Sequence, residues 1–215
     1  MTQVTPLSEA QQVVRIIAAT AIDNETYFCE LDAVVGDGDF GYSLARGFGR
    51  LMEDWETLEY DDVAGLLRRC AMVISGRVGG ASGPIWGTAF LRAAMALRDR
   101  PDPDGADVVS ALRASIEGIK QRGGSDVGDK TLLDALVPAV DTLERELTAG
   151  NGAAAALTAG ATSARSAAEG TRGMLARRGR AAYAGERSLD SVDAGAIAVA
   201  VMFEAVRDGW DATDA

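Results

Sequence analysis

Apolar side chains recur at helical spacing through nearly the whole of this 215-residue chain. In the segment 61–75, for example, five of them fall on one helix face: Val63, Leu66, Leu67, Cys70 and Ile74. No segment shows the sustained period-two alternation, bounded by hairpin turns, that is typical of strands. The pattern therefore predicts an all-α protein, with helices over residues 8–28, 43–55, 61–75, 84–97, 106–120, 131–147, 151–177 and 195–206.

Gly-rich or otherwise irregular loops follow the first, third, fifth and seventh of these eight helices. In an up-down arrangement, alternate loops emerge at the same end of a helical bundle. We therefore expect a single domain, residues 1–215, with all of these loops at one end. Ser8 is expected to cap the first helix, and Pro138 to kink the sixth.

The absence of histidine limits the chemistry that this chain can perform. It excludes a Ser-His-Asp triad, a Cys-His pair, His-ligated zinc and a phosphohistidine carrier. The net charge of −11 argues against a nucleic-acid binder, because backbone binding requires clustered Lys and Arg. Any chemistry must then rest on carboxylates, Arg, Lys, hydroxyls, backbone amides or a metal.

Cysteine use and hydropathy bear on the compartment. Cys29 and Cys70 fall in helical segments, and we expect two buried free thiols, as in a reducing compartment, rather than a disulfide. No basic start followed by an apolar run, typical of a secretory signal, is visible. The longest apolar stretch, residues 196–203, is too short for a bilayer, which takes about 20 residues. We expect a cytoplasmic protein with no membrane partner.

Three carboxylates lie within eight residues in the segment 31–43, LDAVVGDGDFGYS. Asp is a poor helix former and Gly frees the backbone, so we interpret the whole segment as a loop. Three negative charges in one short loop repel each other unless a cation compensates them. Oxygen ligands on a flexible loop suit Mg²⁺ or Ca²⁺. The candidate ligands are Asp32, Asp37 and Asp39.

The loop has three other possible interpretations. Gly36, Gly38 and Gly41 spell G-x-G-x-x-G, but a dinucleotide fingerprint requires a preceding strand. An EF-hand loop requires an acidic twelfth residue, which no count from the three aspartates provides. A solvated turn that caps the next helix stays open as the structural alternative. The functional interpretation joins metal to phosphate, with amide groups of the helix that begins near Gly41 directed at the same place.

Other loops carry weaker signals. The turn 79–83 lets the backbone approach a ligand closely, and Pro84 opens a helix behind it, although a plain helix connection has the same composition. Lys130 is one of two lysines, and a lone lysine is usually a surface charge. Positive charge is concentrated near the end of the chain, in Arg172, Arg177, Arg178, Arg180 and Arg187. One or two of these side chains facing a phosphate would explain the clustering.

Four ordered motifs resemble the nucleotide-binding L subunit, or L domain, of dihydroxyacetone kinases. They are LDAVVGDGDFGYSLAR (31–46), GGASGPIWGTAF (79–90), GDKTLLDALVP (128–138) and GRAAYAGERSLDSVDAG (179–195). The resemblance covers essentially the whole chain. It implies a closed, up-down barrel of eight antiparallel helices with the nucleotide and two Mg²⁺ ions at one end.

The resemblance also implies roles for individual residues. Asp32, Asp37 and Asp39 would be the metal ligands, and Arg180 would help to hold the phosphates during transfer. The remaining residues would contact the nucleotide. Its phosphates would be contacted, through the helix start, by Phe40, Gly41, Tyr42 and Ser43. The region of its base would be contacted by Gly123 and Leu132, and the rest of the site would be formed by Ala81, Ser82, Asp193, Ala194 and Gly195.

In this family a separate K subunit binds the ketose covalently through a histidine, so this histidine-free chain would be half of an enzyme. Some relatives exchange ATP for ADP, whereas others retain ADP and are recharged by a phosphotransferase-system protein. Phe40 departs from the family's usual His or Cys, Ala194 from Pro, and Leu132 from Met. Phe40 therefore leaves an alternative open, a non-catalytic nucleotide-binding module that regulates a partner protein. A metal-dependent phosphatase is a third hypothesis.

Overall fold

The computed structural model describes residues 5–211, and this part of the chain is all-α, as the periodicity predicts. Its α-helices are α1 (Pro6–Asp23), α2 (Glu25–Ala33), α3 (Phe40–Asp54), α4 (Val63–Arg77), α5 (Ser82–Ala96), α6 (Gly105–Gly123), α7 (Leu133–Thr148), α8 (Ala153–Gly170) and α9 (Ala194–Asp211). Three 3₁₀ segments lie between them: η1 (Trp55–Thr57), η2 (Thr171–Gly173) and η3 (Arg180–Ser188).

The first predicted helix, 8–28, is wrong in two respects. It is two helices, because Asn24 ends α1 and begins α2. The Asn24 side-chain amide joins the backbone N–H in donating to the Thr20 carbonyl, a local side-chain bond that closes the last turn of α1 at the break. The cap is Thr5 rather than Ser8: Thr5 Oγ1 accepts from the Ser8 N–H, while Pro6 occupies the first helical position.

The other boundaries differ from the predicted ones by at most three residues, except that α9 continues to Asp211, beyond the predicted end at residue 206, and that the helix before it ends early. The predicted helix 151–177 stops at Gly170, and the chain continues through a short 3₁₀ turn into an irregular segment. Pro138 does lie inside α7, as expected. Both cysteines are free: Cys70 is buried, which raises the pKa of its thiol to about 12, and Cys29 is only partly buried.

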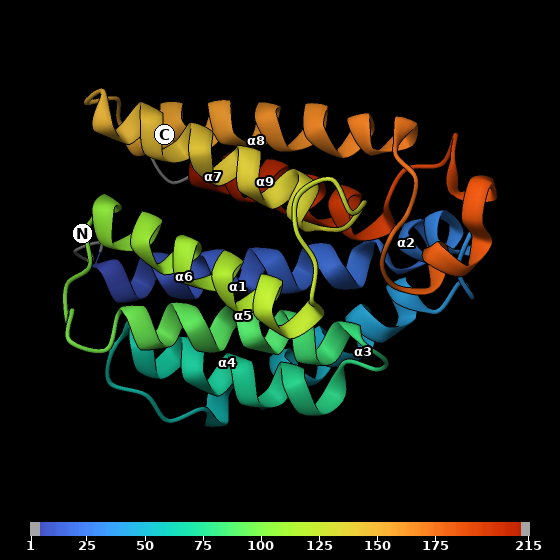
Figure 1. Cartoon of the computed structure of the whole chain (residues 1–215). Helices are drawn as coiled ribbons and strands as arrows, with labels where there is room; N and C mark the ends of the chain where they lie inside the picture. The colour runs from blue at the N-terminus through green and yellow to red at the C-terminus, as the bar shows by residue number, and fades with distance from the viewer. Residues whose placement is uncertain (1–4, 212–215) are drawn as a thin grey trace.

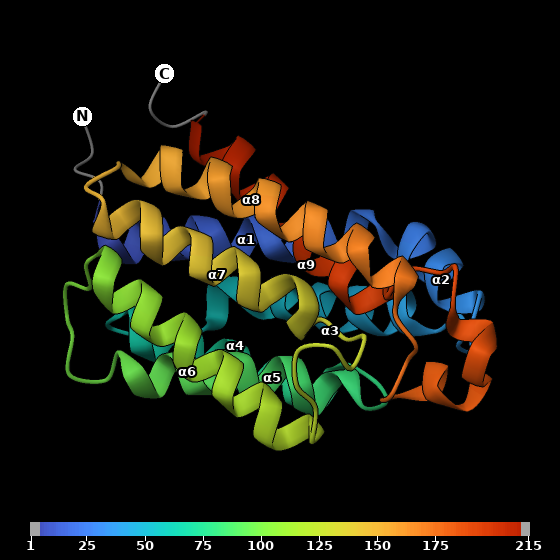
Figure 2. The ribbon, with the colours of Figure 1, turned by 45° about the horizontal axis from the view of Figure 1, so that its top comes forward.

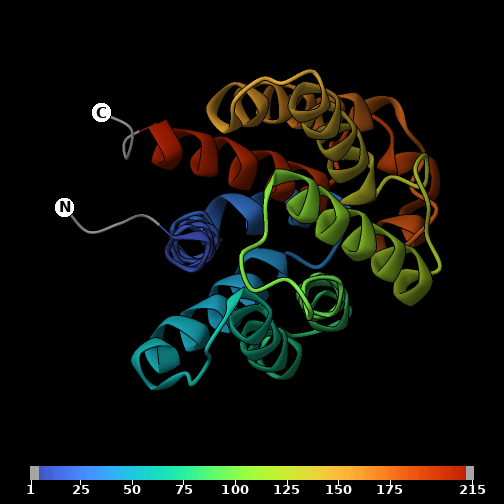
Figure 3. The same cartoon turned by 90° about the vertical axis from the view of Figure 1, so that its left-hand side faces the viewer.

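From α3 onward, successive helices pack side by side and run in opposite directions (Figure 1). α4 packs against α5, α5 against α6, α7 against α8, and α8 against α9. Seen end-on, α1 (blue) lies beside α9 (red), so the first and last long helices are neighbours (Figure 3). None of the helices in residues 5–211 is both long enough and apolar enough to cross a membrane.

The connections after α2, α4, α6 and α8 lie at the same end of the bundle, on the right in Figures 1 and 2. This end contains all four motifs that the sequence singles out. The connections after α5 and α7 lie at the opposite end, on the left in Figure 1. The extra break at Asn24 adds a helix without moving a loop to the other end, because α2 stays at the end that α1 reaches.

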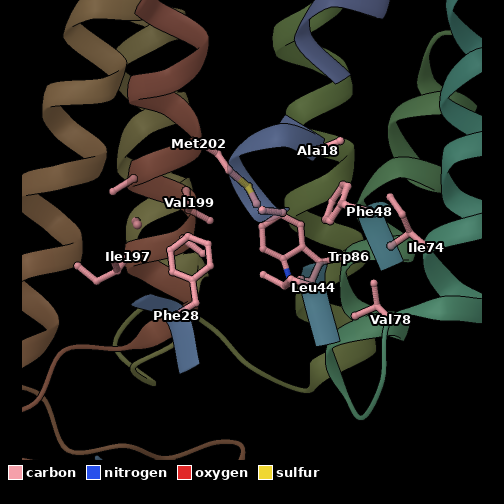
Figure 4. Packing of buried hydrophobic residues seen from close by; sticks show 14 of the residues in the cluster. Ala18, Phe28, Leu44, Phe48, Ile74, Val78, Trp86, Ile197, Val199 and Met202 are labelled. Carbon is pink, nitrogen blue, oxygen red and sulfur yellow. The ribbon is translucent and has the colours of Figure 1, made fainter. Parts of the chain in front are cut away.

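The core fixes the two helices that flank the acidic segment. Phe28 of α2 and Leu44 of α3 are fully buried, and Phe28 lies close to α9 residues in Figure 4. Phe48, one turn further along α3, packs edge-on against Trp86 of α5, with 6.4 Å between ring centroids. Burying side chains of this size contributes roughly 1.5–3 kcal/mol each, so both ends of the acidic loop are held by the core.

Candidate nucleotide and metal site

The three predicted metal ligands come together. Asp32, Asp37 and Asp39 each offer a carboxylate oxygen, and these oxygens lie within 4.8 Å of one another. Asp32 is partly buried, and Asp37 and Asp39 are exposed. Three hard oxygen ligands on the accessible side of a loop form a donor set that fits Mg²⁺ and leaves room for phosphate oxygens.

The acidic loop is shorter than predicted. Residues 31–33 belong to α2 and residues 40–43 to α3, which leaves residues 34–39 as the connection. Asp32 shapes this turn itself, because its Oδ2 accepts a 2.9 Å hydrogen bond from the Gly38 N–H. Gly38 has φ +74°, a left-handed conformation that a side chain would disfavour.

Asp39 occupies the N-cap position of α3, yet its carboxylate accepts no capping hydrogen bond there. Most Asp residues at this position accept from the second or third amide of the helix. The capping alternative, a solvated turn, therefore does not account for Asp39. Its carboxylate instead faces Asp37, Arg180 and Asp32.

The N-terminus of α3 packs directly onto α2. A Cβ on Gly41 would overlap the Glu25 carbonyl oxygen and crowd the Cys29 amide, so only glycine fits there. The Tyr42 N–H donates to Cys29 Sγ at 3.2 Å, and the Ser43 N–H donates to the Asp39 carbonyl. Backbone contacts to a ligand at this helix start are therefore left to Phe40 and Gly41, whereas Tyr42 and Ser43 would act through their side chains.

The Phe40 side chain packs against the core and next to Phe28. It is partly buried against the main core, and its ring lies 6.1 Å from that of Phe28, centroid to centroid. A residue that replaces the family's usual His or Cys thus serves to attach α3 to α2. Any contact of Phe40 with a phosphate would run through its backbone.

Arg180 links the late Arg-rich segment to the acidic loop. Its guanidinium forms an ion pair with Asp37 and lies 4.0 Å from Asp39 Oδ2, while the side chain stays 60 % exposed. Partial burial and the negative charge of Asp37 raise the pKa of Asp39, and Arg180 opposes that rise. The other arginines make different contacts: Arg178 pairs with Asp129, and Arg172 donates to the Asp190 carbonyl.

Ala81 and Ser82 lie where α4 gives way to α5, at the same end of the bundle. The turn reaches the α3 start at one point, since a Cβ on Gly79 would stand 3.0 Å from Ser43 Oγ. Ala81 is exposed and Ser82 is partly buried. Both are therefore available beside the helix start, although the carboxylate cluster itself contains neither of them.

Leu132 and the turn before α9 are neighbours. A Cβ on Gly195 would stand 3.3 Å from the Leu132 Cβ and 3.1 Å from Asp193 Oδ2. Asp193 caps α9 by accepting from the Ala196 N–H at 2.7 Å. Burial is the main cause that raises the pKa of Asp193 to about 7. Ala194 is the first residue of α9 and is partly buried.

Gly123 is the last residue of α6, where it is exposed. A Cβ there would stand 3.2 Å from the Ile85 Cδ1 atom of α5, so its close neighbour is the helix that Ser82 begins. It thus shares an end of the bundle with the acidic loop without joining the carboxylate cluster.

The burial of two charged residues near this end of the bundle, Lys130 and Asp134, is not predicted from the sequence. Lys130, expected at the surface, is only 2 % exposed and has φ +62°. Asp134 is 3 % exposed, and its carboxylate accepts from the Gly128 and Thr131 amides at 2.5 and 2.7 Å. The available signal was the pair of acidic residues around one of only two lysines, in a segment otherwise rich in glycine.

The comparisons with known proteins agree with this geometry. A sequence model of the DAK2 domain matches residues 34–208. The PEP-dependent dihydroxyacetone kinase, ADP-binding subunit DhaL, of Escherichia coli K12 is 37% identical over 178 residues, which cover 83% of this chain and 85% of that protein. The ADP-binding subunit DhaL of PEP-dependent dihydroxyacetone kinase 1 of Listeria innocua is 35% identical, with 86% of this chain and 87% of that protein covered.

A larger relative and a solved structure extend the match. An L-erythrulose kinase of Pectobacterium atrosepticum is 37% identical over 85% of this chain, which corresponds to 31% of that longer protein. The crystal structure of the C. freundii dihydroxyacetone kinase with AMP-PNP and Mg²⁺ has a TM-score of 0.74 and 28% identity. The match covers 97% of this chain and 35% of the C. freundii kinase chain.

The all-helical bundle, with a three-carboxylate cluster and glycine-rich loops at one end, places this chain in the class of all-α domains with a candidate metal site at one end of the bundle. Within that class, the chain belongs to the DAK2-domain family and resembles the DhaL subunits of dihydroxyacetone kinase over most of its length.

Proposed function

We propose that this protein is the nucleotide-binding subunit of a dihydroxyacetone, or related ketose, kinase. It would transfer a phosphoryl group from an Mg²⁺-bound nucleotide to a ketose held by a separate K-type subunit. The observation that carries the proposal is the cluster of Asp32, Asp37 and Asp39 with Arg180 beside it. The DhaL relatives and the dihydroxyacetone kinase with AMP-PNP and Mg²⁺ support it.

Asp32, Asp37 and Asp39 would hold two Mg²⁺ ions, which supply charge neutralisation for the phosphates of ADP or ATP. The carboxylates and Arg180 then have complementary tasks. The carboxylates would hold the Mg²⁺ ions that bind the nucleotide phosphates, and the Arg180 guanidinium would contact the phosphates directly. Together they would orient the terminal phosphoryl toward the partner subunit. Catalysis of this type consists mainly of positioning and charge stabilisation.

The exposed acidic loop leaves the metal-phosphate side open to another molecule. Asp37 and Asp39 are exposed, and Arg180 lies over them with more than half of its side chain accessible. The chain has no histidine, so the covalent ketose-binding step that the family resemblance implies belongs to the K-type subunit. The proposal extends to a cytoplasmic location and includes two sources of the phosphoryl group: exchanged ATP, or a phosphotransferase-system donor that recharges retained ADP.

The proposal also includes closure of the helices into a barrel around an apolar core. The packing of α1 against both α3 and α9 supports this, because it joins the beginning of the helical series to its end. With α2 counted separately, the barrel would have eight long walls and one short helix beside the site.

Release of nucleotide on denaturation is the first test. The purified protein is denatured and the supernatant is analysed for ADP. Stoichiometric ADP indicates a retained cofactor recharged by a phosphotransferase-system protein, whereas an empty protein that binds ATP indicates direct use of ATP. A protein that neither contains nor binds an adenine nucleotide in the presence of Mg²⁺ overturns the proposal.

Turnover separates the enzyme from its alternatives. Mixing the protein with a K-type subunit, a phosphoryl donor and dihydroxyacetone should produce dihydroxyacetone phosphate. Binding without turnover, across a set of ketoses, would favour the regulatory module, and phosphate release without any partner would indicate a phosphatase.

A further inference from the structure

The segment between α8 and α9, residues 171–193, places Arg180 over the acidic loop with little apolar support. Most of its side chains are exposed, among them Tyr183, at 92 %. Its buried side chains are small or polar: Thr171, Ala176, Ser188, Ser191 and Val192. A hydrophobic core therefore cannot fix the shape of this segment, and polar contacts must do so.

Lys130 makes several of these polar contacts through one side chain. Its ammonium donates to the carbonyl oxygens of Met174, Ser188 and Ser191, the first at 3.1 Å and the last at 2.7 Å. Met174 precedes Arg180 in the chain, and the two serines follow it. One side chain thus joins both limbs of the segment that carries Arg180, and its three N–H donors match three carbonyl acceptors.

The ammonium is held by dipoles rather than by an ion pair. Within residues 5–211 no carboxylate lies within ion-pair distance of Lys130. The pKa of Lys130 is lowered, and burial is the main cause. The more distant negative charges of Asp193 and Asp190 oppose this shift in part. Burying a cation without an ion pair is costly, so an apolar side chain of similar length would serve packing better. The ammonium instead fixes the position of one limb of the segment relative to the other.

Neighbouring bonds align the same two segments. The Arg177 N–H donates to the Asp129 carbonyl at 3.0 Å, and Arg178 pairs with the Asp129 carboxylate at 3.3 Å. Asp134 in turn fixes the turn 128–131 from which Lys130 extends. The turn before α7, held by Asp134, therefore supports the segment that carries Arg180.

We propose that Lys130 is a positioning residue: by joining both limbs of residues 171–193 to the start of α7, it holds Arg180 over the three aspartates. This inference rests on the proposed function only where it concerns nucleotide affinity. The hold on the segment is a property of the unliganded protein and can be measured without nucleotide.

The unliganded protein supplies the first test, limited trypsin digestion of wild type, Lys130→Met and Lys120→Met. Lys120 is the only other lysine and forms exposed ion pairs with Asp126 and Glu117, which makes it a matched control. We expect Lys130→Met to speed cleavage at the arginines of residues 171–193 by roughly tenfold, the effect of losing ~1.4 kcal/mol of local stability. Cleavage elsewhere should be unchanged, and Lys120→Met should resemble wild type. Equal cleavage of all three proteins overturns the inference.

Amine acylation of the wild-type protein keeps the test valid if Lys130→Met does not fold. Because the chain has only two lysines, mass spectrometry can follow each of them. Lys120 should react quickly, and Lys130 should react only after denaturant is added. Acylation of both at the same rate in the native protein contradicts the proposed hold.

A double-mutant cycle tests whether Lys130 acts through Arg180. Lys130→Met should weaken Mg²⁺–ADP binding about tenfold in the wild-type background and much less in Arg180→Ala, since the residues are coupled. Equal losses in both backgrounds would assign Lys130 a merely structural role. If wild-type protein binds no nucleotide, the proposed function fails, while the trypsin and acylation results still decide whether Lys130 holds the segment.

Discussion

Arg180 forms an ion pair with Asp37, which brings the late Arg-rich segment onto a loop near the beginning of the chain. Both side chains are partly solvent-exposed, so the pair by itself contributes little to folding stability. Its importance is geometric: it places a cation at the edge of a cluster of carboxylates. The same place would have to accommodate Mg²⁺ and phosphate together, with opposite charges alternating across the site.

Asp37→Asn should abolish Mg²⁺-dependent nucleotide binding and leave the protein helical. The amide removes a negative oxygen from the cluster, and we expect at least a hundredfold loss of affinity, about 2.8 kcal/mol. Isothermal titration calorimetry measures the affinity, and circular dichroism checks the fold. Asp141→Asn, which alters an exposed ion pair with Arg113, is the control and should bind normally. Unchanged affinity in Asp37→Asn would sink the metal assignment.

Arg180→Ala should weaken Mg²⁺–ADP binding by about 1.5–3 kcal/mol, the usual contribution of a hydrogen bond to a charged group. The thermal midpoint should stay close to that of wild type, because the Arg180 side chain is mostly exposed. Titration with ADP at fixed Mg²⁺ provides the measurement. Arg145→Ala, at an exposed pair with Glu146, should not change the affinity. A variant that binds as tightly as wild type would separate Arg180 from the phosphates.

Asp193 should make the metal-free protein less stable as the pH rises from about 4 to 7. Its pKa is raised to about 7 in the folded state, so the native protein binds a proton that the unfolded chain has already released. The stabilisation is complete below the unfolded pKa and is lost as the pH passes the folded one. The slope from this group is at most about 1.4 kcal/mol per pH unit.

Comparison with Asp193→Asn isolates that contribution from the other titrating groups around it, namely Asp134, Lys130 and Asp32. Asn retains an oxygen that can cap α9 but cannot ionise. Urea denaturation at several pH values should therefore give a flatter profile for the variant. Parallel profiles for the two proteins would contradict the raised pKa.

Gly41→Ala should destabilise the protein by about 1–3 kcal/mol, because a Cβ there collides with the α2 backbone. Gly49 offers a control in the same helix, since a Cβ at that position meets nothing within 4 Å. Gly49→Ala should instead stabilise α3 by about 0.5–1 kcal/mol. Opposite signs in the urea midpoints would show that the close approach of α3 to α2, rather than helix propensity, requires glycine at position 41.

Local signals fixed the correct parts of the fold. Helical periodicity located every long helix, and three aspartates within eight residues, two of them next to glycine, marked the metal cluster. The misplaced boundaries have local causes: the Asn24 side chain donates to a helix carbonyl at the break, and Asp32 sits in the last turn of α2 rather than in a loop. Propensity alone does not predict such local hydrogen bonds.

The sequence by itself determined the all-helical architecture, the absence of histidine chemistry and the set of carboxylates available to a cation. Only the tertiary structure decided that Arg180 reaches those carboxylates and that Lys130 is buried beneath the segment carrying it. The physical reason is that a lysine has the same composition and spacing signal whether it is solvated or enclosed. Its burial depends on three carbonyl groups that the chain delivers more than forty residues later.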